Sequence, residues 1–313
     1  MFCICALLRE IKNTKKKENM SQRKLRFALF GKKFQENKLL AIRKILDCLS
    51  FSQADIYIER DFYHYLCSTL HLNVPVQGVF ERGYFDVDFV VSVGGDGTFL
   101  RAASQVGSKG TPIIGVNTGR LGFLADVLPG EIETAFSEIL CGNYSIENHS
   151  VIQVTAEGDP LTGNPYALND IAVLKRDNAS MISVRTCVNG EYLVTYQADG
   201  LLISTPTGST AYNLSNGGPI IVPNAHNLCI TPVAPHSLNI RPIVVNDDCV
   251  VTLEVESRSR NFLVAVDGRS EKRLQGSALT IRKAPFDVRI VKRSNQRYFS
   301  TLREKMMWGA DQR

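Results

Sequence analysis

Three glycines around one aspartate are the first feature of the sequence that could carry chemistry. Residues 89–101 read Phe-Val-Val-Ser-Val-Gly-Gly-Asp-Gly-Thr-Phe-Leu-Arg, so an apolar run leads directly into Gly94, Gly95, Asp96 and Gly97. Glycines let the backbone approach a bulky ligand and present N–H groups to an anion such as phosphate, and the start of a helix attracts anions as well. Asp96 would repel phosphate unless it handled a proton or a cation, which makes it a candidate general base or metal partner. An ordinary turn without any ligand is the alternative interpretation.

A second glycine-rich segment follows the next apolar run. Residues 114–124 read Ile-Gly-Val-Asn-Thr-Gly-Arg-Leu-Gly-Phe-Leu. If both runs are strands of one parallel sheet, the loops that follow them share its carboxyl edge, where ligands bind in such folds. The sequence has no G-x-x-x-x-G-K-[ST] segment, and no G-x-G-x-x-G follows its first apolar run, so any nucleotide would be held by a different kind of loop.

Polar residues that could bind a nucleoside occur further along the chain. Residues 199–215 combine an apolar run with a dense series of hydroxyls, in which Ser209 or Thr210 could cap a following helix. Small hydroxyls beside glycine suit ribose or phosphate, although a plain loop and helix cap would need no ligand. Asn169 and Asp170 interrupt an earlier apolar run. A carboxylate accepts hydrogen bonds from a ribose diol, but a bulge or strand end is the commoner explanation of such a pair.

The elements that would position these residues change character near residue 150. Before it, short apolar runs alternate with stretches of helical period, as where Leu39, Ile42, Ile45 and Leu49 recur three or four residues apart. Strands that alternate with helices predict an open, mostly parallel α/β sheet for residues 25–147. The expected strands are 25–30, 89–93 and 112–116, and the expected helices are 37–50, 98–106 and 131–140.

The second half of the chain has a different pattern of expected secondary structure. After residue 150 short β segments follow one another closely, and Asn189-Gly190 between two alternating runs is a strong hairpin signal, because a type I′ turn requires positive φ at both central residues. We therefore expect a β-rich, antiparallel domain over residues 148–296 and a final segment, 297–313, that returns to pack on the first domain. Residues 1–24 are a basic extension. Of these, 1–19 form either an upstream extension or a misassigned start, because Met20 lies just before the first expected strand.

Composition narrows the classes of function. The chain has 313 residues, 44% of them hydrophobic, which is enough for two globular domains. Its net charge of +5 comes from residues 1–33, where ten Lys and Arg face two Glu; residues 34–313 carry 26 basic and 29 acidic residues, or −3. The net charge of the chain therefore does not indicate nucleic-acid binding.

Cysteine and histidine usage gives no sign of a metal site. The eight cysteines have neither disulfide-framework nor zinc spacing, which favours a reducing cytoplasm, and the five histidines are expected to be surface or structural residues. The apolar opening of the chain is too short to span a bilayer, and its charges are in the wrong order for a secretory signal.

Taken together, these segments resemble the NAD kinase family from about residue 25 to residue 309. Gly-Gly-Asp-Gly-Thr alone would be weak evidence for this family, since diacylglycerol-type lipid kinases and phosphofructokinases have a similar segment. The 199–215 block after an Asn-Asp pair is far more specific to the family. The segments that carry the resemblance are 94–98, 117–124, 169–170, 199–219, 266–269 (Val-Asp-Gly-Arg) and 299–305 (Phe-Ser-Thr-Leu-Arg-Glu-Lys).

The resemblance implies a fold, a reaction and an assembly. The fold would be that of the NAD kinase and diacylglycerol kinase group, and the reaction would move the ATP γ-phosphoryl group to the 2′-hydroxyl of the adenosine ribose of NAD, giving NADP. ATP and NAD would be the substrates, with a divalent cation, Mg²⁺, carried by ATP. The protein would be a cytoplasmic homodimer or homotetramer, with neither nucleic acid nor membrane as a partner.

The resemblance also assigns residues. Asp96 would take the hydroxyl proton, Arg101 would reach phosphate, and Asp199 would bind the nucleoside from its own or a neighbouring subunit. The full set of nucleotide-binding residues implied in this way is Gly95, Gly97, Arg101, Asn169, Asp170, Asp199, Thr210, Ala211, Tyr212, Asn213, Leu214, Ser215 and Arg269. The sequence departs from the family at 30–34, where relatives commonly have Asn-Pro, and at Ser180, where many have His; these differences concern substrate contacts rather than the reaction class.

Two alternatives stay open at this point. A lipid kinase that shares the Gly-Gly-Asp-Gly loop would need an acyl-binding cleft and affinity for membranes. The basic N-terminal run is the only feature of the sequence that supports membrane affinity. A non-catalytic NAD(P)-binding sensor would keep the pocket and lack turnover, which the presence of Asp96 disfavours.

Overall fold

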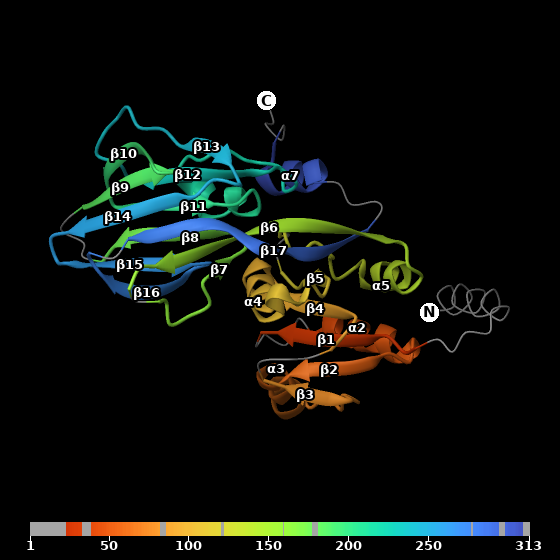
Figure 1. The fold of residues 1–313 in the computed structure, drawn as a ribbon. Helices are drawn as coiled ribbons and strands as arrows, with labels where there is room; N and C mark the ends of the chain where they lie inside the picture. Colours follow the sequence, from red (N-terminus) through yellow and green to blue (C-terminus); the bar gives the residue numbers. More distant parts are fainter. Residues whose placement is uncertain are drawn as a thin grey trace.

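The computed structural model describes residues 23–32, 39–81, 86–119, 122–158, 160–176, 181–276, 278–293 and 298–308. The basic extension up to residue 22, together with Lys33, Phe34 and Ser180, lies outside the described residues. In Figure 1 the chain forms a parallel-sheet region, coloured red to yellow, and a β-rich region, coloured green to blue.

The N-terminal region is the parallel α/β sheet that the sequence predicts. Five parallel strands lie in the order β5-β4-β1-β2-β3. The order reverses between β1 and β4, which makes the carboxyl edge there a switch point of the kind where ligands bind. The strands are β1 (Arg26–Gly31), β2 (Asp55–Glu59), β3 (Gly78–Phe80), β4 (Phe89–Gly94) and β5 (Ile113–Asn117).

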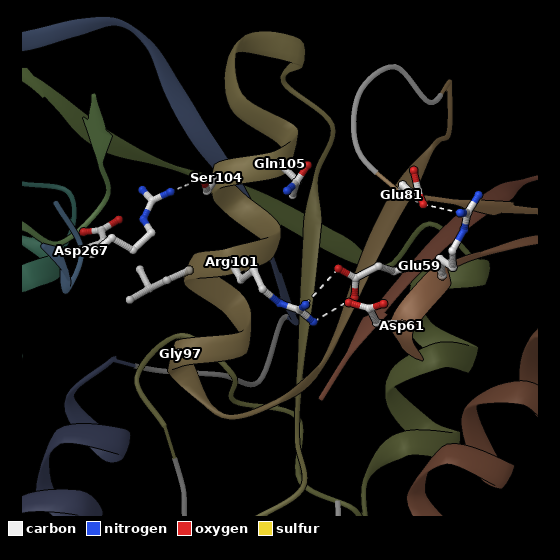
Figure 2. Close-up of a pocket in the computed structure, with 11 residues that line it drawn as sticks. Glu59, Asp61, Glu81, Gly97, Arg101, Ser104, Gln105 and Asp267 are labelled. Carbon is white, nitrogen blue, oxygen red and sulfur yellow. Dashed lines mark hydrogen bonds and ion pairs between the residues drawn. The ribbon is translucent and has the colours of Figure 1, made fainter. Parts of the chain in front are cut away.

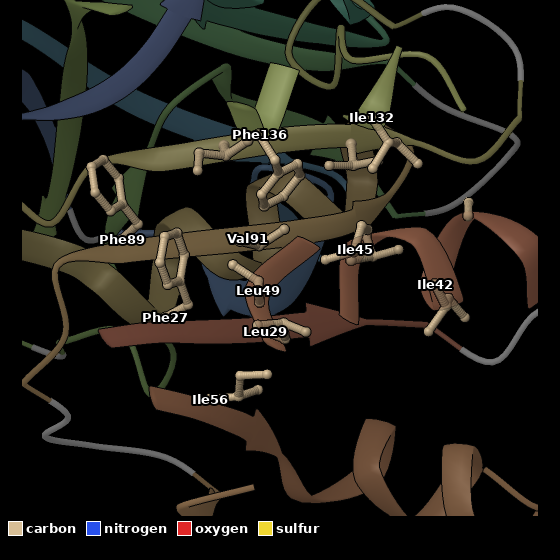
Figure 3. Packing of buried hydrophobic residues seen from close by; sticks show 14 of the residues in the cluster. Phe27, Leu29, Ile42, Ile45, Leu49, Ile56, Phe89, Val91, Ile132 and Phe136 are labelled. Carbon is tan, nitrogen blue, oxygen red and sulfur yellow. The ribbon is translucent and has the colours of Figure 1, made fainter. Parts of the chain in front are cut away.

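Helices cover both faces of this sheet. All six residues of β4 are buried, as expected for a central parallel strand, and α2 turns Ala41, Ile42, Ile45 and Leu49 inward at helical spacing. Figure 3 shows the resulting core between the sheet, α2 and α5, while α4 covers the opposite face. The helices are α2 (Leu39–Phe51), α3 (Arg60–His64), which continues as a π-helical turn (Tyr65–Thr69), α4 (Asp96–Val106), which ends in a 3₁₀ turn (Gly107–Lys109), and α5 (Ile132–Leu140).

The start of α4 differs from the prediction. The sequence predicts a helix over residues 98–106, but α4 begins at Asp96 with Gly95 as its N-cap residue, and Thr98 is buried within the first turn. The glycines allow the chain to turn directly from β4 into the helix, so Asp96 itself lies in the first helical turn.

The C-terminal region is an antiparallel β-sandwich. One layer contains β10, β9, β14 and β17, and the other is a six-stranded sheet in the order β13-β12-β11-β8-β15-β16. Fully buried side chains such as Val173, Leu201, Val251 and Val264 fill the space between the layers. The predicted hairpin joins β9 to β10, with φ of 52° at Asn189 and 82° at Gly190.

The strands of the second half follow one another closely, as the sequence pattern indicates. Its strands are β6 (Tyr144–Ala156), β7 (Tyr166–Ala167), β8 (Asp170–Lys175), β9 (Ile182–Val188), β10 (Glu191–Ala198), β11 (Gly200–Ser204), β12 (Asn227–Val233), β13 (Ile243–Asn246), β14 (Val251–Ser257), β15 (Asn261–Val266), β16 (Arg269–Leu274) and β17 (Leu279–Arg293). A 3₁₀ turn (Thr207–Thr210) and the short α6 (Tyr212–Ser215) follow β11, and α7 (Tyr298–Met306) follows β17.

Two long strands join the halves. β6 and β17 pair antiparallel along almost their whole length, and Ile290 of β17 also pairs with Ile113 of β5, so the parallel sheet continues into the sandwich (Figure 1). The expected boundary at residues 147 and 148 therefore falls inside β6, and the two halves share a sheet.

Candidate active site

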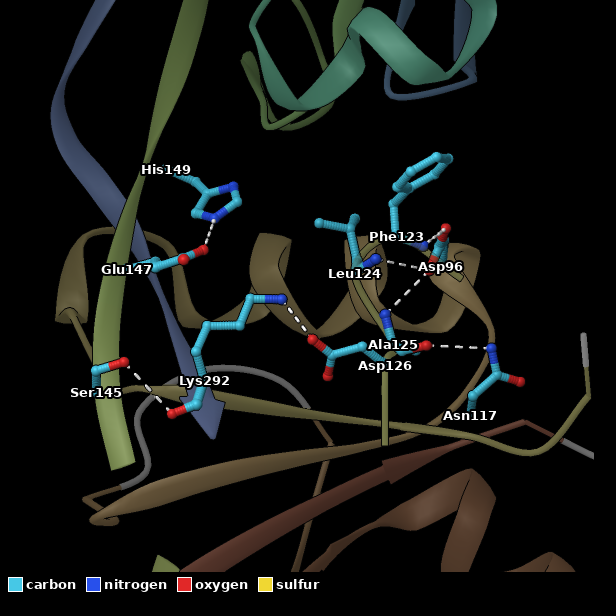
Figure 4. Close-up of polar contacts among 10 residues, drawn as sticks. All are labelled: Asp96, Asn117, Phe123, Leu124, Ala125, Asp126, Ser145, Glu147, His149 and Lys292. Carbon is cyan, nitrogen blue, oxygen red and sulfur yellow. Dashed lines mark hydrogen bonds and ion pairs between the residues drawn. The ribbon is translucent and has the colours of Figure 1, made fainter. Parts of the chain in front are cut away.

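Asp96 lies at the carboxyl end of β4, where its carboxylate is held by a loop. Oδ1 accepts hydrogen bonds from the backbone N–H groups of Leu124 (3.1 Å) and Ala125 (3.0 Å), and Oδ2 accepts one from that of Phe123 (3.0 Å), as Figure 4 shows. The side chain stays 30% exposed. The carboxylate is thus fixed in orientation while one edge remains open to a substrate.

Gly122 allows this contact. A Cβ atom at Gly122 would lie 2.1 Å from Asp96 Oδ1 and 3.0 Å from the carbonyl oxygen of Ala125, so any larger residue would displace the loop or the carboxylate. The structure therefore brings the two glycine-rich segments together at one edge of the sheet. Arg120 and Leu121, within the second segment, lie outside the described residues.

A second carboxylate, that of Asp267, organises the Asn-Asp pair. Its oxygens accept hydrogen bonds from the backbone N–H groups of Leu168 (2.9 Å), Asn169 (2.8 Å) and Asp170 (3.2 Å). Burial, with the nearby charge of Asp267 as a second cause, raises the pKa of Asp170 to about 7. Because Asp267 has three N–H donors, it is the better site for the negative charge and Asp170 the better site for the proton.

The Asn169 side chain has an unpaired acceptor. Its Oδ1 is buried without a hydrogen-bond partner among the described residues. A buried, unpaired amide oxygen is costly unless something donates to it, so this atom is available to a ligand.

The hydroxyl-rich loop packs directly against this pair. The Thr205 hydroxyl donates to the Leu168 carbonyl oxygen and accepts from the Gly208 N–H, and the Thr205 N–H donates to the Asn169 carbonyl oxygen. Thr210, Ala211 and the 40% exposed Tyr212 follow at once in the chain.

The remaining residues of this block divide into buried and accessible ones. Asn213 is fully buried, and its side chain bonds to Ser209, Pro219 and Thr231, so within the described residues it holds the loop together. Leu214 is half-buried and Ser215 is exposed.

The capping prediction for this loop is wrong. Neither Ser209 nor Thr210 caps α6, whose N-cap residue is Ala211 without a side-chain bond. The Ser209 hydroxyl instead donates to the carbonyl oxygen of Ile221 and accepts from its N–H, and the Thr210 hydroxyl donates to the Thr207 carbonyl oxygen. Long-range and turn contacts have taken up the hydroxyls that would have served as caps.

His149 connects the shared strand β6 to the same loop. Its Nδ1 lies 2.8 Å from the Thr207 hydroxyl and its Nε2 lies 3.3 Å from Glu147 Oε2. Burial lowers the pKa of His149, which favours the neutral ring. In Figure 4 the pair lies near the ion pair of Lys292 with Asp126, the residue that follows Ala125. The sequence predicts a surface or structural role for His149, and the structure gives it a structural one.

A cavity of about 650 Å³ runs along the outer side of α4. Figure 2 shows that it extends from Gly97, in the glycine turn, to Glu59 and Glu81 at the ends of β2 and β3 on one side and to Asp267 on the other. Arg269 of β16 also lines it. The cavity therefore adjoins the switch point of the parallel sheet and touches both halves of the molecule. Its lining residues are Glu59, Arg60, Asp61, Glu81, Gly97, Leu100, Arg101, Ser104, Gln105, Asp267 and Arg269.

Two arginines of the cavity are held by specific partners. Arg101 makes a two-pronged ion pair with Glu59, with 2.9 Å for each contact, and also donates to the Gly31 carbonyl oxygen. Arg269 donates to the Ser104 hydroxyl (3.1 Å), which bridges the sandwich to α4. Burial raises the pKa of Glu59 against the opposing effect of Arg101. Glu59 was not predicted as a site residue, because nothing in its local sequence marks it.

Asp199 is the predicted site residue that lies apart from the others. It precedes β11, whose other end pairs Ser204 with Asp170, so roughly five residues of strand, or about 17 Å, separate Asp199 from the Asn-Asp pair. Its carboxylate makes an ion pair with Lys175 (2.7 Å).

The fold places a glycine turn, a fixed carboxylate and a cavity near the switch point of a parallel sheet, where a nucleotide could bind. Two family models match the chain, the ATP-NAD kinase N-terminal domain over residues 26–144 and the ATP-NAD kinase C-terminal domain over residues 168–293. The chain belongs to the NAD kinase family.

Individual relatives agree with this assignment. An NAD kinase of Bacteroides fragilis is 55% identical over 289 residues, which cover 92% of this chain and 100% of the relative. An NAD kinase of Porphyromonas gingivalis is 43% identical over 285 residues, covering 91% and 98%. These relatives support an NAD kinase over the lipid kinase alternative.

Solved structures give the same fold. Yeast NADH kinase complexed with NADH matches with a TM-score of 0.82 and 21% identity, over 94% of this chain and 90% of that chain. An NAD kinase from Archaeoglobus fulgidus in complex with ATP matches with a TM-score of 0.70 and 27% identity, over 90% and 99%. The α/β N-terminal domain and β-rich C-terminal domain expected from the sequence are confirmed.

Proposed function

We propose that Asp96 is the general base in the ATP-dependent phosphorylation of NAD, the reaction of the family to which the chain belongs. The observation that carries the proposal is the geometry of this carboxylate: three backbone N–H bonds fix it at the mouth of a glycine turn, yet its side chain stays 30% exposed. In this role Asp96 accepts the proton of the 2′-hydroxyl of the adenosine ribose as that oxygen attacks the γ-phosphorus of ATP. The products are NADP and ADP.

This reaction requires no covalent intermediate with the protein. Phosphoryl transfer depends mainly on alignment of the two oxygens and on neutralisation of charge on the transferred group. The N-terminus of α4 and the glycine turn supply backbone N–H groups and a positive dipole end for phosphate. A Cβ atom at Gly95 or Gly97 would meet nothing within 4 Å, so open space adjoins the backbone there, as close approach of a phosphate would require.

The two substrates are assigned to different parts of the site. The phosphates of ATP are assigned to the end of the cavity at Gly97, where Arg101 and Arg269 would offset part of the charge of the lining carboxylates Glu59, Asp61, Glu81 and Asp267. The nucleoside parts of NAD bind to Asn169 and Asp170, and to the accessible residues of the 210–215 segment (Thr210, Ala211, Tyr212, Leu214 and Ser215), while buried Asn213 supports that segment from behind. The unpaired Oδ1 of Asn169 supports this arrangement, because a ligand donor would satisfy it.

A divalent cation, Mg²⁺, is assigned to the phosphates of ATP. Within the part of the chain that the structure describes, no three His, Cys, Asp or Glu side chains converge in a geometry that would hold a metal ion. Magnesium commonly binds nucleotide phosphates with one or two carboxylates. When bound, it would offset the negative charge of the phosphates, and the chain's own role is to orient them.

The position of Asp199 favours a homo-oligomer, a dimer or a tetramer. At about 17 Å from the Asn-Asp pair along β11, Asp199 is too distant to contact the same nucleoside within one chain. In a symmetric assembly the same residue can reach the site of a neighbouring copy. We assign the protein to the cytoplasm on its cysteine usage. Among the described residues, no helix is long and apolar enough to cross a bilayer.

The test of the function is an assay on the full chain with ATP, Mg²⁺ and NAD, in which an NADP-specific dehydrogenase detects the product. The proposal predicts NADP formation that requires all three additions. Folded protein that binds NAD without ATP-dependent product would instead indicate a sensor, and phosphorylation of diacylglycerol vesicles without NADP would indicate a lipid kinase.

A further inference from the structure

A lysine of the C-terminal helix lies beside the proposed base. Lys305 Nζ is 3.6 Å from Asp96 Oδ2 and 4.3 Å from the centre of the Phe123 ring. Phe123 is also the residue whose N–H donates to Asp96 Oδ2. The ammonium group therefore contacts both the proposed base and the loop that holds it, although Lys305 is 209 residues from Asp96 and 182 residues from Phe123 in the sequence.

The packing of α7 holds this lysine in place. Leu302 of α7 is 3% exposed. Tyr298, the first residue of α7, has its ring 6.3 Å from the ring of Phe123. The Trp308 N–H donates to the Arg303 carbonyl oxygen just after the helix ends. The Tyr298–Phe123 contact thus places the start of α7 against the loop that holds Asp96.

A positive charge at this point lies next to the place where the attacking oxygen and the transferred phosphoryl group carry negative charge. Preorganised charges at such a place lower the barrier, because alignment and charge neutralisation dominate phosphoryl transfer.

We propose that Lys305 is a positioning residue of the phosphotransferase site, which fixes Asp96 Oδ2 and supplies a positive charge beside the reacting oxygen. The proposal rests on the proposed function and deepens it, because it makes the C-terminal helix part of the catalytic arrangement. The Phe123 ring contributes by holding the ammonium group over its face, a contact that favours a cation near the ring.

The test compares Lys305→Met, Lys305→Arg and Arg303→Met in the full chain. Arg303 is a matched control, because it is a cation on the same helix that is exposed to solvent. For each variant, kcat and the KM values for NAD and ATP are measured together with the melting temperature. Wild-type protein is assayed in parallel.

We expect Lys305→Met to lower kcat by about 10- to 100-fold and to change either KM by less than about threefold, the pattern of an interaction made in the transition state. Lys305→Arg should recover most of the rate, and Arg303→Met should match wild type.

Three results would overturn the inference. They are an unchanged kcat for Lys305→Met, a loss of rate that merely follows a loss of folded protein, and equal losses in the Met and Arg variants of Lys305. Absence of NADP from the wild-type protein would refute the proposed function and this inference with it, whereas activity shared equally by wild type and Lys305→Met would refute the inference alone.

Discussion

Asp170 and Asp267 lie close together and are largely shielded from solvent, so two negative charges there would cost free energy of folding. The folded-state pKa of Asp170, about 7, lies above its ordinary value of 3.8, first because of burial and second because of Asp267. The folded protein therefore binds this proton more tightly than the unfolded chain does. The resulting stability is fully present below about pH 4 and is lost as the pH rises through 7, with a ceiling of about 4 kcal/mol for a shift of this size.

Replacing Asp170 with Asn should remove this pH dependence. The amide imitates the neutral acid, so Asp170→Asn should unfold at a higher temperature than wild type at pH 8 and at a similar temperature near pH 4. Melting curves across this range, without substrates, give the comparison. Asp267→Asn is the matched control. It should destabilise the protein, because an amide is a poorer acceptor for three N–H donors. A steeper pH dependence in Asp170→Asn would contradict this description of the pair.

At the scale of elements, the loop 122–125 holds the Asp96 carboxylate in place. Gly122→Ala should lower kcat by about 100-fold, because a Cβ atom 2.1 Å from Asp96 Oδ1 must push the carboxylate out of alignment. The measurement is kcat together with the melting temperature.

Gly130→Ala is the control for the Gly122 variant. A Cβ atom at Gly130 meets nothing within 4 Å, and it should leave both quantities near wild type. Gly122→Ala with a rate within a few-fold of wild type would mean that Asp96 does not need its three N–H donors.

Local sequence patterns predict the strand, turn and helix of residues 89–106 but not the distant residues that bond to the site. The apolar run, the glycines and the helical period of residues 89–106 indicate strand, turn and helix in order, and parallel strands place both glycine turns at one edge. The bonds that complete the site join residues with no shared local pattern. Asp267 reaches backbone groups 97 to 99 residues away, His149 reaches Thr207 58 residues away, and Arg101 reaches Glu59 42 residues away. Only the packed fold brings such pairs together.

At the scale of the whole molecule, β6 and β17 make the two halves one cooperative unit. Ile290 is fully buried where β17 meets β5, so Ile290→Ala should lower the free energy of unfolding by about 2–5 kcal/mol. Urea unfolding should still show one transition, seen alike by far-UV circular dichroism and by the fluorescence of Trp308, the single tryptophan.

The control for Ile290→Ala is a partly exposed isoleucine of the sandwich. Ile243, on β13, is 37% exposed, and Ile243→Ala should cost less than about 1 kcal/mol. Two separate transitions in the wild-type protein, one for each half, would show that the shared strands do not couple them.

In the proposed reaction Asp96 takes the proton of the NAD hydroxyl. The most direct test of this role is the turnover of Asp96→Asn, measured as NADP formed from saturating ATP, Mg²⁺ and NAD, beside the affinity of the same variant for NAD. Because an amide cannot accept the proton, kcat should fall by roughly 10²- to 10⁴-fold while NAD binding is retained. Turnover within a few-fold of wild type, in a folded variant that binds NAD, would contradict the claim.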